Sequence, residues 1–174
     1  MGELREVIDA PLSSEELAVR YRALCDDPLL QNVPGKIELD SWGRILMSPA
    51  GTYHALVQGR LCRKLAVLGG ESFVEASIVT SIGVFVPDVV WASTEFMRAH
   101  RNETPLTRAP EICVEVASPG NSTKELREKV EAYLSLGAVE AWIVYPQSKR
   151  FEFFTTDGKV PQSRYAVDLS GLFD

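Results

Sequence analysis

The stretch Val84–Trp91, with the sequence VFVPDVVW, places one acidic residue, Asp88, in the middle of an apolar run. Its β-branched and aromatic residues favour β-strands, and Pro87 marks a break between two of them. We therefore expect strands at 84–86 and 89–92, with a carboxylate where the second begins. An ionised carboxylate in a core costs several kcal/mol unless it is paired, hydrogen-bonded or bound to a metal.

A second acid interrupts the strand expected at Glu111–Val116, which reads EICVEV. The strand period of two separates its β-branched apolar residues from Glu115, which lies near the carboxyl end of the strand. A divalent cation shared with Asp88 would explain both acids, and Mg²⁺ takes one or two protein carboxylates together with substrate phosphate oxygens. This pattern points to phosphodiester hydrolysis. Taken singly, each acid also fits a structural interpretation, in which Asp88 caps the chain after Pro87 and Glu115 faces solvent or pairs with an arginine.

Helix and strand signals alternate along the rest of the chain. Capping boxes begin helices at Ser13 and Ser122, and Thr52 is the expected N-cap of another. The expected helices are 13–26, 52–68 and 122–136, and the expected strands are 36–40, 44–48, 73–79, 84–86, 89–92, 111–116, 141–145 and 151–155, with a loop or irregular helix at 93–110. The predicted fold class is mixed α/β. Without repeats or linkers, we expect one domain over 1–174, with a helical lead-in at 1–35 and a core at 36–155.

The composition is that of a globular protein without a basic field. The 174 residues are 45% hydrophobic and 24% charged, and the formal charge is -6, whereas nucleic-acid-binding domains usually carry a positive surface. No segment approaches the roughly 18 apolar residues that cross a bilayer, and the first residues lack the pattern of a signal peptide. We expect a cytoplasmic protein with no membrane contact and with three reduced core cysteines. The sequence has no motif for zinc, nucleotide phosphates or a serine nucleophile.

Lys129 and Glu38 are further candidates for the same site. On an ideal helix Lys129 lies at the margin of the apolar arc, so it can lean toward the strand that carries Glu115. A cation there could hold an attacking water or offset charge on the phosphate. An ordinary surface pair with Glu125 is an equally good interpretation. Glu38 is the polar residue between two apolar neighbours of its strand, where a solvent-facing side chain is common.

The order and spacing of several motifs resemble a known family. These motifs are VPDVVW (86–91), EVASP (115–119), KxxxY (129–133) and GAVEAWIV (137–144), followed by Pro146. They resemble the Uma family of putative restriction endonucleases, within the PD-(D/E)XK nuclease superfamily. The motif ELDxxGxIxMSP (38–49) and His54 extend the likeness to residues 36–155.

The resemblance implies a Mg²⁺-dependent endonuclease that hydrolyses DNA phosphodiester bonds, with Mn²⁺ as a substitute ion. Asp88 and Glu115 would bind the metal, Lys129 would orient or activate water, and Glu38, which matches the family's early glutamate, would assist. The fold would be restriction-endonuclease-like, with a central mixed sheet flanked by helices. A homodimer is expected, because many such nucleases pair to cut both strands.

Two positions depart from the expected patterns. The superfamily's usual lysine, two residues after the glutamate, is Ala117 here, and the resemblance implies that in this family the lysine has moved to the helix, where Lys129 of KxxxY fits. The family's WxVDP is WIVYP, with Tyr145 in place of the aspartate. One alternative is therefore a binding or interaction module that keeps the fold but has lost efficient cleavage, which the negative net charge also favours. Another is a glycosidase that uses two acids, although an aromatic-rich sugar platform is missing.

Overall fold

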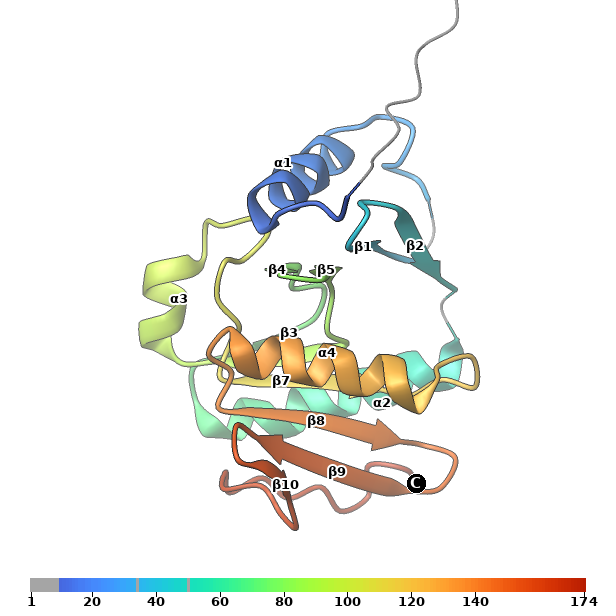
Figure 1. Cartoon of the computed structure of the whole chain (residues 1–174). Coiled ribbons are helices and arrows are strands. Elements are labelled where there is room, and N and C mark those ends of the chain that lie inside the picture. Colours follow the sequence, from blue (N-terminus) through green and yellow to red (C-terminus); the bar gives the residue numbers. More distant parts are fainter. Residues whose placement is uncertain (1–9, 34, 50) are drawn as a thin grey trace, which may run out of the picture.

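The computed structural model describes residues 10–33, 35–49 and 51–174, which form two β-sheets and four α-helices (Figure 1). The helices are α1 (Ser14–Cys25), α2 (Thr52–Leu65), α3 (Thr94–His100) and α4 (Thr123–Ser135). The smaller sheet has the order β2-β1-β5-β4, made of β1 (Lys36–Asp40), β2 (Ile45–Ser48), β4 (Ile78–Thr80) and β5 (Gly83–Phe85). The larger sheet has the order β10-β9-β8-β7-β6-β3, made of β3 (Glu71–Phe73), β6 (Val89–Ala92), β7 (Ile112–Val116), β8 (Glu140–Tyr145), β9 (Arg150–Thr155) and β10 (Gly158–Val160). The mixed α/β class is confirmed.

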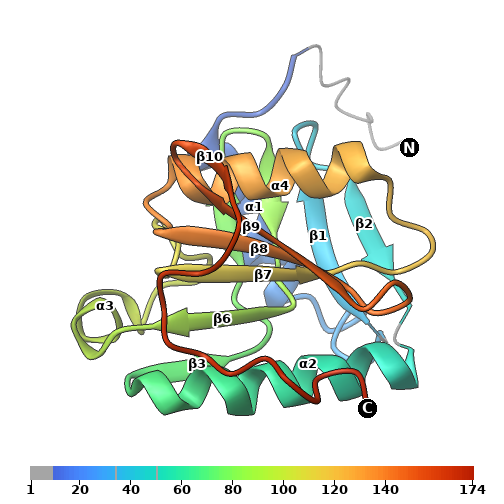
Figure 2. The ribbon, with the colours of Figure 1, turned by 90° about the horizontal axis from the view of Figure 1, so that it is seen from below.

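The larger sheet is covered on both faces, by α4 on one side and by α2 on the other (Figure 2). Successive residues of β7 alternate between the two layers, so that Cys113 packs toward α4 and Val114 toward α2. The strands β7 and β8 run parallel and are joined by α4. Because both faces are buried, these strands have the nearly continuous apolar sequences that are typical of a covered parallel pair.

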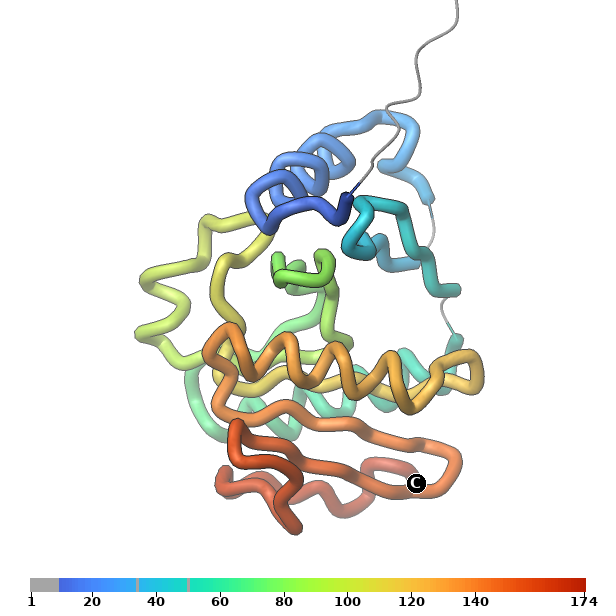
Figure 3. The backbone as a smooth tube through the Cα atoms, in the orientation of Figure 1, coloured from blue at the N-terminus to red at the C-terminus, as the bar shows by residue number. Residues whose placement is uncertain are grey.

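The smaller sheet packs against α1 and lies above the α4 side of the larger sheet (Figure 3). Its core contains Leu17 from α1 together with Leu39 and Val84 from the strands. The chain passes from the larger sheet to the smaller one after β3 and returns after β5. The second crossing is the Val86–Asp88 segment, which brings Asp88 to the space between the sheets.

Several sequence-based expectations about elements need correction. The single strand expected at 73–79 is wrong, because the chain leaves the larger sheet at Phe73, takes a left-handed backbone conformation at Glu75 (φ 60°) and enters the smaller sheet only at Ile78. The segment expected to be a loop or irregular helix at 93–110 contains the regular helix α3, capped by Ser93.

Three smaller differences concern a cap, a strand and the cysteines. Thr52 is the first residue of α2, and Gly51 is its N-cap. The strand β10 was not expected. Cys113 is buried as expected, but Cys25 is exposed, so the expectation of three core thiols is wrong. Among the described residues, no helix has both the length and the apolar character needed to cross a membrane.

Candidate active site

The pairing of β6 with β7 brings the two acids together. Val89 lies opposite Val114 in this antiparallel pair, so one further step along the register places Asp88 opposite Glu115. Residues directly opposite each other have Cβ atoms about 4.5–5.5 Å apart and point to the same face. Both acids lie on the α4 face, and both residues are buried, at 4% and 3% exposed.

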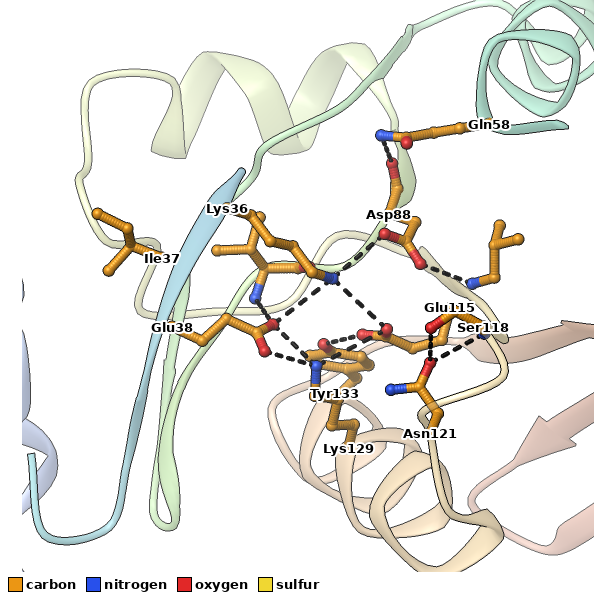
Figure 4. A network of polar contacts seen from close by, with 12 residues as sticks. Lys36, Ile37, Glu38, Gln58, Asp88, Glu115, Ser118, Asn121, Lys129 and Tyr133 are labelled. Carbon is orange, nitrogen blue, oxygen red and sulfur yellow. Dashed lines mark hydrogen bonds and ion pairs between the residues drawn. The ribbon is translucent and has the colours of Figure 1, made fainter. Parts of the chain in front are cut away.

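Asp88 is held by hydrogen bonds from the next strand and by the beginning of α2. Its Oδ2 accepts a hydrogen bond from the Val116 amide at 2.7 Å and lies 3.4 Å from His54 Nε2. His54 Nε2 is also 3.0 Å from the Val116 carbonyl oxygen. Gln58, one turn further along α2, donates to the main-chain oxygen of Asp88 at 2.7 Å. These contacts orient the Asp88 carboxylate so that Oδ1 faces the space between the sheets (Figure 4).

Glu115 has one oxygen in a short hydrogen bond and one oxygen near two ammonium groups. Oε1 accepts from the buried hydroxyl of Tyr133 in α4 at 2.6 Å. Oε2 lies 3.8 Å from Lys129 Nζ and 3.9 Å from Lys36 Nζ, which is too long for a hydrogen bond in either case. Tyr133 therefore fixes the carboxylate and leaves Oε2 directed at the cations.

Glu38 reaches the same place from the smaller sheet. Its Oε1 accepts hydrogen bonds from the Val86 amide at 2.7 Å and from Lys129 Nζ at 2.8 Å, and Oε2 also accepts from Lys129 Nζ at 2.8 Å. The surface pair considered between Lys129 and Glu125 is not formed, since the Glu125 carboxylate closes the capping box at the start of α4. Lys129 instead lies against Glu38.

Lys36 is the charged group of this site that sequence reasoning missed. Its Nζ donates to the Val86 carbonyl at 2.9 Å and to Asp88 Oδ1 at 3.2 Å. It is also 3.7 Å from Glu38 Oε1 and 3.9 Å from Glu115 Oε2, so it contacts all three acids (Figure 4). The strand period could have identified Lys36, because residues two positions apart in a strand share a face and Lys36 precedes Glu38 by two positions.

The pKa values reflect competition between burial and these charges. Burial would raise the pKa of Asp88, but the hydrogen bond from His54 and the charge of Lys36 hold it below its usual value. Burial raises the pKa of Glu115, although the lysine charges oppose this. Burial would lower the pKa of Lys36, but the three acids raise it above its usual value. Burial also raises the pKa of Tyr133 well above its usual value, so its hydroxyl remains a donor.

The donor set fits one type of metal site and excludes others. Among the residues described here, no group of three or more His, Cys, Asp or Glu side chains could hold a metal ion. Asp88 and Glu115 offer two oxygens that face one shared cation position, which the ammonium of Lys36 takes. Two carboxylates with water and substrate oxygens are the ligands with which Mg²⁺ is usually held. The residues therefore fit Mg²⁺ but not an all-protein metal cage.

A family model described as Uma2, putative restriction endonuclease, matches residues 19–171 of the chain. The chain belongs to this family. A solved structure described as a putative nuclease from Anabaena variabilis superposes with a TM-score of 0.63 at 16% sequence identity, covering 94% of this chain and 98% of that chain. At this identity the likeness shows the fold alone, and the predicted nuclease-like fold is confirmed. No curated protein matches the chain.

The Uma2 family description supports a nuclease function in general. The departures from the family pattern are explained in part by the structure. Tyr145 donates a hydrogen bond to Glu152 Oε2 at 3.1 Å and belongs to an ion-pair cluster with Arg127, outside the site. At Ala117 the usual lysine is missing, and Lys129 of α4 lies 3.8 Å from Glu115 Oε2 instead.

Proposed function

We propose that this Uma2 protein is a metal-dependent endonuclease that hydrolyses phosphodiester bonds of DNA. The observation that carries the proposal is the meeting of Asp88, Glu115, Glu38 and Lys129 in one buried network, although they come from both sheets and α4. Bringing three carboxylates together costs free energy. Binding of a cation and a phosphate would explain why the protein keeps this arrangement.

Asp88 and Glu115 would hold Mg²⁺, with Mn²⁺ as a substitute. The bound ion would lower the pKa of a water molecule and offset charge on the phosphate. Lys129, fixed by two 2.8 Å contacts to Glu38, is placed to orient the attacking water or to stabilise the phosphoryl oxygens. Glu38 would assist by holding Lys129, since its own oxygens are occupied by that ammonium and by a main-chain amide.

The charge of the site supports a requirement for a divalent cation. Three carboxylates and the two lysines leave the site one unit negative when His54 is neutral. A phosphodiester would be repelled by this charge, whereas a divalent cation would remove the net negative charge of the site even when it displaces one of the lysines. Hydrolysis would then form a bond from water oxygen to phosphorus, break one ester P–O bond and deliver a proton to the departing oxygen.

A binding module that no longer cleaves is the second candidate. The position of Lys36 favours it, because this ammonium already offsets part of the charge of Asp88 and Glu115 without a metal. The net charge of -6 also favours weak rather than strong contact with DNA.

Plasmid cleavage tests the proposal. Wild-type protein should nick or cut plasmid DNA with Mg²⁺ or Mn²⁺ and not with EDTA, whereas Asp88→Asn and Glu115→Gln should lose this activity. Lys129→Met should impair cleavage far more than Lys124→Met, its matched control, since the Lys124 side chain is 86% exposed on the same helix. Circular dichroism would verify that the variants fold. Undiminished cleavage by both acid variants would refute the metal site.

The other outcomes separate the two candidates. Retention of DNA in a gel shift, with no cleavage under any divalent cation, would support the binding module. A homodimer and a cytoplasmic location are also proposed, and light scattering during gel filtration tests the first of them.

A further inference from the structure

The ammonium of Lys36 lies in the space that a shared cation would need. Asp88 Oδ1 and Glu115 Oε2 are 3.2 and 3.9 Å from the same nitrogen atom. A Mg²⁺ ion binds oxygens at about 2.0–2.1 Å, so an ion that touched both carboxylates would have to lie between these two atoms. The ion and the ammonium cannot occupy that space together.

We propose that Lys36 is an internal counter-ion that takes the cation position in the metal-free protein and has to leave it when a divalent ion binds. The inference rests on the proposed metal site at Asp88 and Glu115. Lys36 has no role in the catalytic set proposed above. The affinity for metal would then depend on this residue of β1 as well as on Asp88 and Glu115.

Lys36 is less firmly held than the other lysine of the site. Lys129 makes two 2.8 Å contacts to Glu38 and lies over the ring of Phe85, with the ring centre 5.3 Å from Nζ. Lys36 donates hydrogen bonds of 3.2 Å to Asp88 and 2.9 Å to a carbonyl, its contacts with Glu38 and Glu115 are longer, at 3.7 and 3.9 Å, and its side chain is 20% exposed. It is also the first residue of β1, and its four-carbon stem is flexible. Lys36 can therefore move outward while Lys129 keeps its place.

Removal of Lys36 should strengthen metal binding. A divalent ion has to displace a paired ammonium in the wild type but not in Lys36→Met. Without that competition, and without the repulsion between the two cations at a few ångströms, the affinity should rise by about tenfold or more. The acids themselves lose their counter-ion, so the metal-free variant should also melt at a lower temperature than the wild type.

Titration with Mn²⁺ in the absence of nucleic acid measures this directly. Isothermal calorimetry or the EPR signal of free Mn²⁺ gives the dissociation constant of the full chain. We expect Lys36→Met to bind at least about tenfold more tightly than the wild type, Lys36→Arg to bind no more tightly, and Lys124→Met to be unchanged. Lys129→Met also removes one positive charge near Glu115, but it leaves Lys36 in the position between the acids. The increase in Mn²⁺ affinity should therefore be smaller than in Lys36→Met.

Unchanged or weaker binding by Lys36→Met, while the wild type binds Mn²⁺, would overturn the inference and leave the proposed function standing. An equal gain in Lys129→Met would also overturn it, because general electrostatics would then explain the effect. Failure of both the wild type and Lys36→Met to bind Mn²⁺ would refute the metal site itself, and the proposed function with it.

A measurement on the wild type covers the case in which Lys36→Met does not fold. Labelling of lysines with an amine-reactive ester, mapped by mass spectrometry, reports how accessible each ammonium is. Mn²⁺ should increase the labelling of Lys36 severalfold and leave Lys124 unchanged, because Lys124 pairs only with surface Glu128 among the described residues. Labelling of Lys36 that stays constant or falls on addition of Mn²⁺ would contradict its release.

Discussion

The ion pair between Glu38 and Lys129 joins the smaller sheet to α4, and removing its cation should lower stability. The two side chains are 6% and 15% exposed, and breaking a buried pair typically costs about 3–5 kcal/mol because one charge is left without compensation. Lys36 Nζ lies 3.7 Å from Glu38 and will compensate part of this charge. We therefore expect Lys129→Met to lower the free energy of unfolding by about 3 kcal/mol, or the melting temperature by roughly 6–12 °C for a chain of this size.

Urea unfolding of a double-mutant cycle measures the pair itself. Glu38→Gln with Lys129→Met removes both charges and keeps an oxygen for the Val86 amide, so the double variant should be at least about 1 kcal/mol more stable than the sum of the single effects predicts. Lys124→Met breaks only an exposed 3.8 Å contact to Glu128 and should cost less than about 0.5 kcal/mol. Equal losses for Lys129→Met and Lys124→Met, or strictly additive single effects, would refute the reasoning.

Two further changes test the groups that orient the acids. Tyr133→Phe removes the hydroxyl that donates to Glu115 at 2.6 Å, so the free energy of unfolding in urea should fall by about 1–3 kcal/mol; an unchanged value would contradict that hydrogen bond. His54→Gln removes a group whose pKa is raised by its hydrogen bond to Asp88. The stabilisation by protonated His54 is fully present below its ordinary pKa of 6.5 and is lost as the pH rises through the raised pKa of the folded state. The stability difference between wild type and His54→Gln should therefore be largest below about pH 6.5 and shrink as the pH rises above it, and a difference independent of pH would argue against the ion pair.

Local signals in the sequence predicted the elements that carry the site. The capping box of Ser122 and Glu125 begins α4 where expected, and both of its reciprocal contacts are present. The period of two along β7 correctly separated Glu115 from the apolar residues that face α2, because alternation depends only on the strand's own geometry. The apolar arc of α4 likewise indicated the direction in which Lys129 points.

The contacts between distant segments could not be predicted in the same way. The two ends of the expected strand at 73–79 belong to different sheets. The turn at Glu75 contains no glycine or proline that would have predicted it. Lys36 resembled an ordinary surface lysine at the start of a hairpin, because two of the three acids that surround it, Asp88 and Glu115, lie about 50 and 80 residues further along the chain. The hydroxyl contact of Tyr133 with Glu115 depends on how α4 packs against β7, which no local signal in the sequence gives.

The antiparallel register of β6 and β7 also determines which changes in chain length the protein can tolerate. A deletion of one residue within either strand would turn Asp88 or Glu115 to the opposite face, into the apolar layer beneath α2. The connection between Ala92 and Ile112, which contains α3, lies outside the paired segment that aligns the acids. Homologous proteins can therefore differ in the length of this connection, but not in the spacing within the two strands, and still bring both carboxylates to one point.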